Sequence, residues 1–215
     1  MRIFAALLLF LLVLPGFIFA KIPNDVFYDE LWYLDHISAP LAWDAQTGSH
    51  EIVVAVLDTG LDLDHPDIVD NLWVNEDEIA ENGIDDDGNG FIDDVYGWDF
   101  VDDDGDPAPD TGEDSTPDAV THGTVIAGIA GATGDNGIGI NGVAWNVKLM
   151  SVRMLDAAGA GDSFTASDAI DYAVANGADV INLSFAGELQ DPLMRIAVRD
   201  AYRSGTVIVS ALGNE

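Results

Sequence analysis

Cysteine is absent from this 215-residue chain, and basic residues are scarce. Without cysteine no disulfide can brace the fold, so an exported protein of this composition needs another source of rigidity, and bound metal is the obvious candidate. Seven Lys and Arg stand against 39 Asp and Glu, which gives a formal net charge of -32. Such a surface repels nucleic acid and anionic membranes, so neither is expected as a partner.

The one long apolar run lies at the amino terminus. Arg2 precedes the run Ile3–Leu14, and Pro15-Gly16 and the small Ala20 follow it. This order is typical of a secretory signal peptide, so we expect residues 1–20 to be removed and the protein to be secreted or held at the cell surface. An uncleaved membrane anchor is the alternative, because the run approaches the roughly 18 residues that suggest a span.

The acidic residues are concentrated in segment 58–118, which holds more than half of them and contains no Lys or Arg. A disordered acidic loop and a salt-adapted surface are the simplest readings of such a segment. Against disorder, the segment contains five aromatic side chains that favour burial: Trp73, Phe91, Tyr96, Trp98 and Phe100. A folded segment with this charge requires cations.

The rest of the chain alternates strand and helix signals. Apolar runs such as 52–57 and 207–212 lack the in-out alternation of a half-exposed strand, which favours a parallel sheet buried on both faces. Strands are expected over 51–57, 147–154, 178–183 and 206–211, and helices over 121–132, 163–176 and 191–204. The sequence therefore predicts an α/β fold.

Ligands of such a sheet bind beyond the carboxyl ends of its strands, so the residues found there are candidates for function. Asp58 follows the first strand, Ser184 the third and Asn214 the last, while His122 is placed at the start of a helix. Each of these residues alone also fits a turn or a helix start.

Five segments together carry a more specific signal: VAVLDTGLDLDHPDI (54–68), HGTVIAG (122–128), NGIGINGVAWNVKLMSVRML (136–155), VINLSFAG (180–187) and VIVSALGN (207–214). In content and order they resemble the amino-terminal part of the catalytic domain of the subtilase family of serine endopeptidases. The resemblance implies one peptidase domain over residues 21–215, built on a doubly wound, mostly parallel sheet with helices on both faces. It also implies a polypeptide substrate.

The same resemblance assigns roles to individual residues. A serine hydroxyl needs an imidazole to take its proton, and the imidazole needs a carboxylate to orient it. His122 matches that base and Asp58 that carboxylate, while Asn214 matches the side-chain donor to the oxyanion. The residues matching the two walls that bind an extended peptide are Ser184, Phe185 and Ala186, and Gly159, Ala160 and Gly161.

The sequence also departs from the family pattern. The Gly-Thr-Ser-Met-Ala type motif with the nucleophile does not occur up to Glu215, so we expect a longer gene; a non-catalytic pseudo-protease or a calcium-dependent peptide-binding or adhesion module is the alternative. Val125 replaces a histidine common in the family. No propeptide is evident, because mature-like sequence over 23–44 follows the signal directly.

Segment 82–94, NGIDDDGNGFIDD, predicts a calcium loop. Its alternating oxygen-bearing residues before Gly90 have the spacing of the first half of an EF-hand loop, although Tyr96 occupies the twelfth position in place of Glu. The candidate ligands are Asp85, Asp87, Asn89, the carbonyl of Phe91, Asp93 and Asp94. A solvated acidic turn is the alternative.

Further cation sites are also expected. Segment 102–107, DDDGDP, is a second acidic candidate. The family resemblance alone implies another site made by Asp25, Asp67 and Asn136 with backbone carbonyls around Gly134, Ile138 and Ile140. Ligands so distant in sequence would tie the amino terminus to the sheet.

Overall fold

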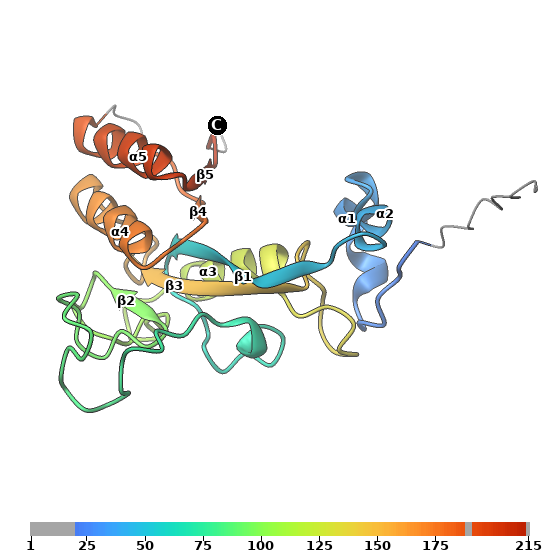
Figure 1. Cartoon of the computed structure of the whole chain (residues 1–215), viewed down its shortest axis with the longest axis horizontal. Coiled ribbons are helices and arrows are strands. Elements are labelled where there is room, and N and C mark those ends of the chain that lie inside the picture. Colours follow the sequence, from blue (N-terminus) through green and yellow to red (C-terminus); the bar gives the residue numbers. More distant parts are fainter. Residues whose placement is uncertain (1–19, 188–190, 214–215) are drawn as a thin grey trace, which may run out of the picture.

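A computed structural model describes residues 20–187 and 191–213 (Figure 1). Its centre is a five-stranded, entirely parallel sheet with the strand order β2-β3-β1-β4-β5. The strands are β1 (Gly48–Asp58), β2 (Gly97–Asp99), β3 (Asn146–Arg153), β4 (Val180–Leu183) and β5 (Val207–Ser210). The parallel α/β sheet predicted from the apolar runs is confirmed, whereas the short β2 within the acidic segment was not predicted.

Helices cover both faces of this sheet. The long ones are α3 (Pro117–Gly131), α4 (Ser163–Ala175) and α5 (Pro192–Ser204); shorter ones are α1 (Trp32–His36), α2 (Ala39–Trp43) and the 3-10 turns η1 (Tyr28–Glu30) and η2 (Val69–Asn71). Along β1, Ala55 and Leu57 pack in the core beneath α4 and α5, while Val56 packs in the core beneath α3. Both faces of β1 are therefore buried, which explains the lack of alternation over 52–57. The same expectation for 207–212 is wrong in this structure, because Val207 and Val209 of the edge strand β5 are 55% and 49% exposed.

The helix that carries His122 begins earlier than the sequence predicted. Thr116 is its N-cap, with a side-chain oxygen that accepts from the backbone N–H of Ala119 at 3.2 Å, and Pro117 takes the first helical position. The prediction that His122 opens the helix is wrong by about one turn. Segment 116–120 was missed because it is too short to show helical periodicity, although Thr-Pro is a favoured helix start.

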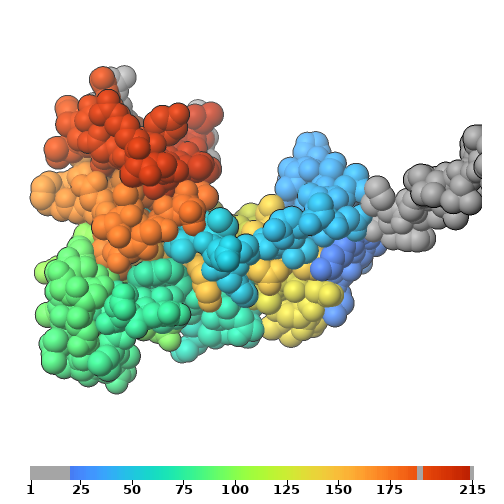
Figure 2. Space-filling view, in the orientation of Figure 1, coloured from blue at the N-terminus to red at the C-terminus, as the bar shows by residue number. Residues whose placement is uncertain are grey.

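The acidic segment is folded onto the sheet through its aromatic residues. Trp98 is 5% exposed, and Phe91 and Phe100 pack against the same core as α4. Figure 2 shows this part of the chain, in green, as a lobe below the orange and red helices α4 and α5. Among residues 20–187 and 191–213, no helix is long and apolar enough to cross a membrane.

Candidate active site

Asp58 and His122, 64 residues apart in sequence, lie side by side in the structure. Nδ1 of His122 is 2.7 Å from Oδ1 of Asp58. The Asp58 side chain is fully buried, whereas the His122 side chain is 44% exposed. A buried carboxylate thus holds an imidazole that remains accessible from solvent, which is the arrangement needed for an oriented general base.

Thr59 positions this pair and was not singled out from the sequence. Its backbone N–H donates to Oδ1 of Asp58 at 2.7 Å, and its hydroxyl donates to the carbonyl of Ala119 in α3 at 2.6 Å. The hydroxyl also accepts from the backbone N–H of Gly123 at 3.2 Å. A Cβ at Gly123 would lie 2.3 Å from the carbonyl oxygen of Gly60, so only glycine allows α3 to approach this turn so closely.

The two predicted peptide-binding walls face a common cleft of about 680 Å³. Gly159, Ala160 and Gly161 line it after β3, and Phe185 and Ala186 line it after β4. Apolar side chains such as those of Leu155, Ala166 and Met194 also line this cleft. The hydroxyl of Ser184 is instead hydrogen bonded to Nδ2 of Asn182 at 2.8 Å. Asn214 lies outside the described residues.

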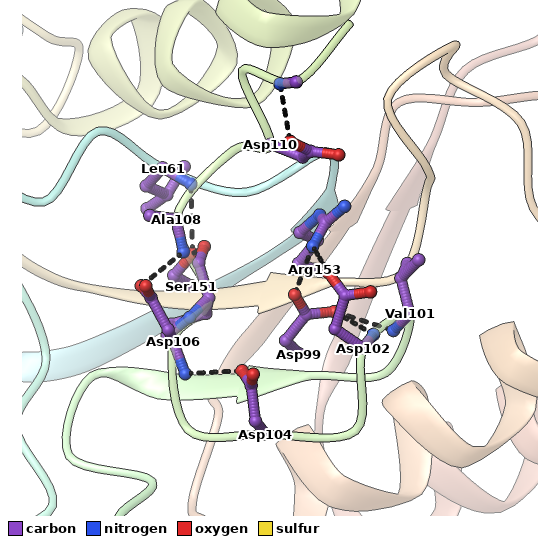
Figure 3. Close-up of polar contacts among 12 residues, drawn as sticks. Leu61, Asp99, Val101, Asp102, Asp104, Asp106, Ala108, Asp110, Ser151 and Arg153 are labelled. Carbon is purple, nitrogen blue, oxygen red and sulfur yellow. Dashed lines mark hydrogen bonds and ion pairs between the residues drawn. The ribbon is translucent and has the colours of Figure 1, made fainter. Parts of the chain in front are cut away.

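The acidic chain that follows β2 is anchored beside the Asp58 turn by two residues of β3 (Figure 3). Ser151 accepts from the backbone N–H of Leu61 at 3.1 Å and donates to the carbonyl of Pro107 at 2.8 Å. Arg153, the register partner of Asp58, donates to Asp99 and, at 2.7 Å, to Asp102. Segment 102–107 is thereby held at both of its ends, by Arg153 at Asp102 and by Ser151 at Pro107.

The Arg153 pair is buried. Arg153 is 3% exposed and Asp99 is 1% exposed. Burial opposes the charge of the guanidinium, but the hydrogen bonds to Asp102 and Asp99 raise the pKa of Arg153. Burial raises the pKa of Asp99, although backbone N–H groups and Arg153 donate to its carboxylate. The charges are thus compensated mainly by one another.

Three carboxylates of the acidic segment converge on one point. The three residues are Glu78, Asp87 and Asp94, here called the acidic cluster. Each offers one oxygen, and these oxygens lie within 4.8 Å of one another, so that they could hold a metal ion. Asp94 is fully buried, and this burial raises its pKa even though Tyr172, Asn75 and Asn89 donate hydrogen bonds to it. A hard cation fits such a set of oxygens. Glu78 was missed because it precedes the EF-hand-like pattern.

The other predicted loop ligands have protein partners. The carboxylate of Asp85 accepts from the backbone N–H groups of Gly88, Asn89 and Gly90, and that of Asp93 accepts from those of Asn82 and Gly83. The side-chain oxygen of Asn89 accepts from the N–H of Phe91 at 2.7 Å. The acidic cluster has protein donors as well, because Glu78 accepts from the backbone N–H groups of Asp86, Asp87 and Asp93, and Asp87 accepts from Asn89.

The structure also brings together the three side chains that the family resemblance assigned to a second type of cation site. Asp25 and Asp67 are 5% and 2% exposed, and Asn136 joins them: its backbone N–H donates to Asp25 at 3.4 Å, and its side chain donates to Asp67 at 2.9 Å. The N–H of Ile140 donates to Asp67 at 2.7 Å, and that of Ile138 to the Asn136 side chain at 2.9 Å. Burial, together with the nearby charge of Asp67, raises the pKa of Asp25.

Comparison with known proteins decides the family. Residues 49–215 match the model of the subtilase family, peptidase S8. The chain belongs to the subtilase family. The subtilase match covers every segment on which the sequence resemblance was based, and it includes Asp58, His122 and both walls of the cleft.

Individual subtilases are similar over most of this chain. It is 36% identical over 203 residues to a thermophilic serine proteinase of Bacillus sp. strain AK1, covering 93% of this chain and 43% of that protein. Thermitase of Thermoactinomyces vulgaris is 35% identical, covering 89% and 58%, and halolysin of Haloferax mediterranei is 38% identical, covering 89% and 32%. The chain thus spans only about a third to three fifths of the length of these relatives.

The fold agrees with that of solved subtilases. A protease of Pseudoalteromonas arctica PAMC 21717 superposes with a TM-score of 0.71 at 31% identity, over 90% of this chain and 60% of that one. A cold-adapted subtilisin-like serine proteinase superposes with a TM-score of 0.56 at 26% identity, over 79% and 49%. The subtilisin-like α/β arrangement is confirmed over this part of the fold.

Proposed function

We propose that this chain supplies the carboxylate, the base and the peptide-binding cleft of a serine endopeptidase. The observation that carries the proposal is the 2.7 Å contact between Nδ1 of His122 and Oδ1 of the buried Asp58. In this role His122 takes the proton of a serine hydroxyl through its other nitrogen, and Asp58 fixes the tautomer and stabilises the imidazolium. On this proposal the serine is supplied from outside residues 1–215, and Asn214 donates to the oxyanion.

The substrate on this proposal is an extended polypeptide. Gly159, Ala160 and Gly161 on one wall and Phe185 and Ala186 on the other leave room for a backbone between them, because four of the five are Gly or Ala. Strand-like pairing with these walls supplies affinity through main-chain hydrogen bonds. The apolar lining of the cleft favours apolar substrate side chains.

Covalent labelling with a fluorophosphonate probe tests this function in the intact protein that carries this chain. We expect the wild type to label and His122→Ala to slow labelling by at least a thousandfold, because the serine is then a weak nucleophile. His36→Ala, at an exposed histidine of α1, is the matched control and is expected to label like the wild type. A folded wild type that does not label would instead indicate a non-catalytic peptide-binding module.

We further propose that divalent cations, calcium in the first place, bind the acidic cluster and the group of Asp25, Asp67 and Asn136. Both places contain buried carboxylates whose negative charge a cation would compensate. A bound cation would supply structural cross-linking and no chemistry at the triad. We also propose that residues 1–20 are a signal peptide and that the protein is exported. Residues 1–19 lie outside the described structure.

Export has indirect support. One relative, 32% identical over 195 residues, is named a halolysin-like extracellular serine protease, from Natrialba magadii. If the protein is exported, bound cations would brace a fold that has no cysteine for disulfides.

A further inference from the structure

Tyr172 joins the acidic cluster to the helix that begins at the cleft. It lies on α4, is 2% exposed, and its hydroxyl donates a 2.7 Å hydrogen bond to Oδ2 of Asp94. Asp94 is fully buried and belongs to the acidic cluster. Neither the triad nor the walls of the cleft use this hydroxyl, so its place beside a cluster carboxylate requires another explanation.

The ring of Tyr172 packs on the same loop that its hydroxyl contacts. The ring of Phe91, between Asn89 and Asp94 in sequence, meets it edge-on with the centroids 4.7 Å apart, and that of Phe100 lies 5.8 Å away. Edge-to-face pairs of this kind stabilise beyond simple burial of area. A change in the shape of the loop therefore reaches α4 through packing as well as through the hydrogen bond.

The other end of α4 forms part of the cleft. The helix begins at Ser163, and the carboxylate of its N-cap, Asp162, accepts from the N–H groups of Phe164 and Thr165 at 2.8 and 2.9 Å. Asp162 and Ser163 line the cleft directly after the wall at 159–161. At a rise of about 1.5 Å per residue, Tyr172 is roughly 14 Å along the helix from Ser163, a distance over which a packed helix moves as one body.

We propose that Tyr172 couples cation binding in the acidic cluster to the order of α4 and of the cleft wall at 159–163. A divalent cation held by Glu78, Asp87 and Asp94 fixes the Asp94 carboxylate. Because Tyr172 donates to that carboxylate, α4 is held in place with it, and the wall that precedes α4 is ordered in turn. Tyr172 is thus a positioning residue. The inference rests on the cation site proposed above.

Hydrogen exchange of the intact protein during a calcium titration tests the coupling. In the wild type, we expect calcium to slow exchange in segments 84–94 and 159–164 with one shared midpoint. Tyr172→Phe keeps the ring but removes the hydroxyl; it is expected to raise the calcium midpoint of 84–94 about tenfold, the lower end of the range for losing a partner of a metal ligand. It is also expected to weaken the calcium response of 159–164, leaving only the part that the retained ring packing carries.

Tyr202→Phe is the matched control, because Tyr202 lies on α5 and is 74% exposed; it should behave as the wild type. Glu78→Gln removes a proposed ligand without altering Tyr172, so both segments should shift together to higher calcium. If near-ultraviolet circular dichroism shows that Tyr172→Phe does not fold, the coupling is tested by hydrogen exchange of Glu78→Gln instead.

The failures of the two proposals are distinguishable. No calcium response of 84–94 in the wild type would count against the cation site itself. A response there without one at 159–164, or wild-type titration of both segments in Tyr172→Phe, would overturn the coupling. Separate midpoints for the two segments in Glu78→Gln would overturn it as well.

Discussion

At the scale of single residues, Arg153 is a buried cation in an acidic chain. It is one of seven basic residues in the chain, yet it is 3% exposed and paired with Asp99, which is 1% exposed. Arg153 lies in segment 136–155, which carries part of the family resemblance, but nothing in the sequence indicated that its partners would come from the acidic segment about 50 residues earlier. A pair of buried charges is tolerated because each neutralises the other.

Removal of the guanidinium should therefore destabilise the fold. We expect Arg153→Leu to lower the free energy of unfolding by about 3–5 kcal/mol, because Asp99 is left as a buried carboxylate without its partner. Urea unfolding of the intact protein measures this difference. Arg199→Leu, at an exposed arginine paired with Asp200, is the matched control and should change stability little. Equal effects of the two substitutions would contradict this account of the pair.

At the scale of elements, α3 brings His122 to Asp58. The close approach of Gly123 to Gly60 and the Thr59 hydroxyl fix where the helix lies on the Asp58 turn. Because α3 begins at Pro117, His122 lies in the second turn of the helix. The helix and strands themselves follow from local patterns, but this start was placed wrongly from the sequence because capping involves only a few atoms and leaves a weak periodic signal.

The N-cap of α3 is open to a direct test. We expect Thr116→Ala to lower the free energy of unfolding by about 1 kcal/mol, since the N–H of Ala119 loses its side-chain acceptor. Thr121→Ala, on the exposed face of the same helix, should change it by less than about 0.5 kcal/mol, because alanine has the better helix propensity. Thermal unfolding of the two variants beside the wild type measures both effects. A larger loss at Thr121 would mean that the cap at Thr116 contributes little.

At the scale of the whole molecule, the charge of -32 and the absence of cysteine set the conditions for stability. Self-repulsion of this size weakens a compact state, and salt reduces it only by general screening. Cations at specific carboxylates act differently, because they bind the folded chain and stabilise it by mass action. The acidic segment is therefore either a salt-adapted surface or a set of cation sites, and the two make different predictions.

Calcium removal distinguishes them. At constant ionic strength, replacing calcium by sodium should lower the melting temperature by roughly 5–10 °C for each site that was filled at a hundredfold excess over its Kd. Differential scanning calorimetry of the intact protein measures the shift, and Glu78→Gln should reduce it. A melting temperature that follows ionic strength alone, whichever cation is present, would favour the salt-adapted surface.

The sequence by itself determined the parallel α/β sheet apart from the short β2, and it singled out Asp58 and His122 as candidates, because strand and helix periods and short motifs are local in the chain. Only the tertiary structure placed His122 against Asp58, added Glu78 to Asp87 and Asp94, and set Arg153 and Tyr172 on the acidic segment. These contacts join residues from 9 to 78 positions apart, and their formation depends on how the layers pack, which no local spacing encodes.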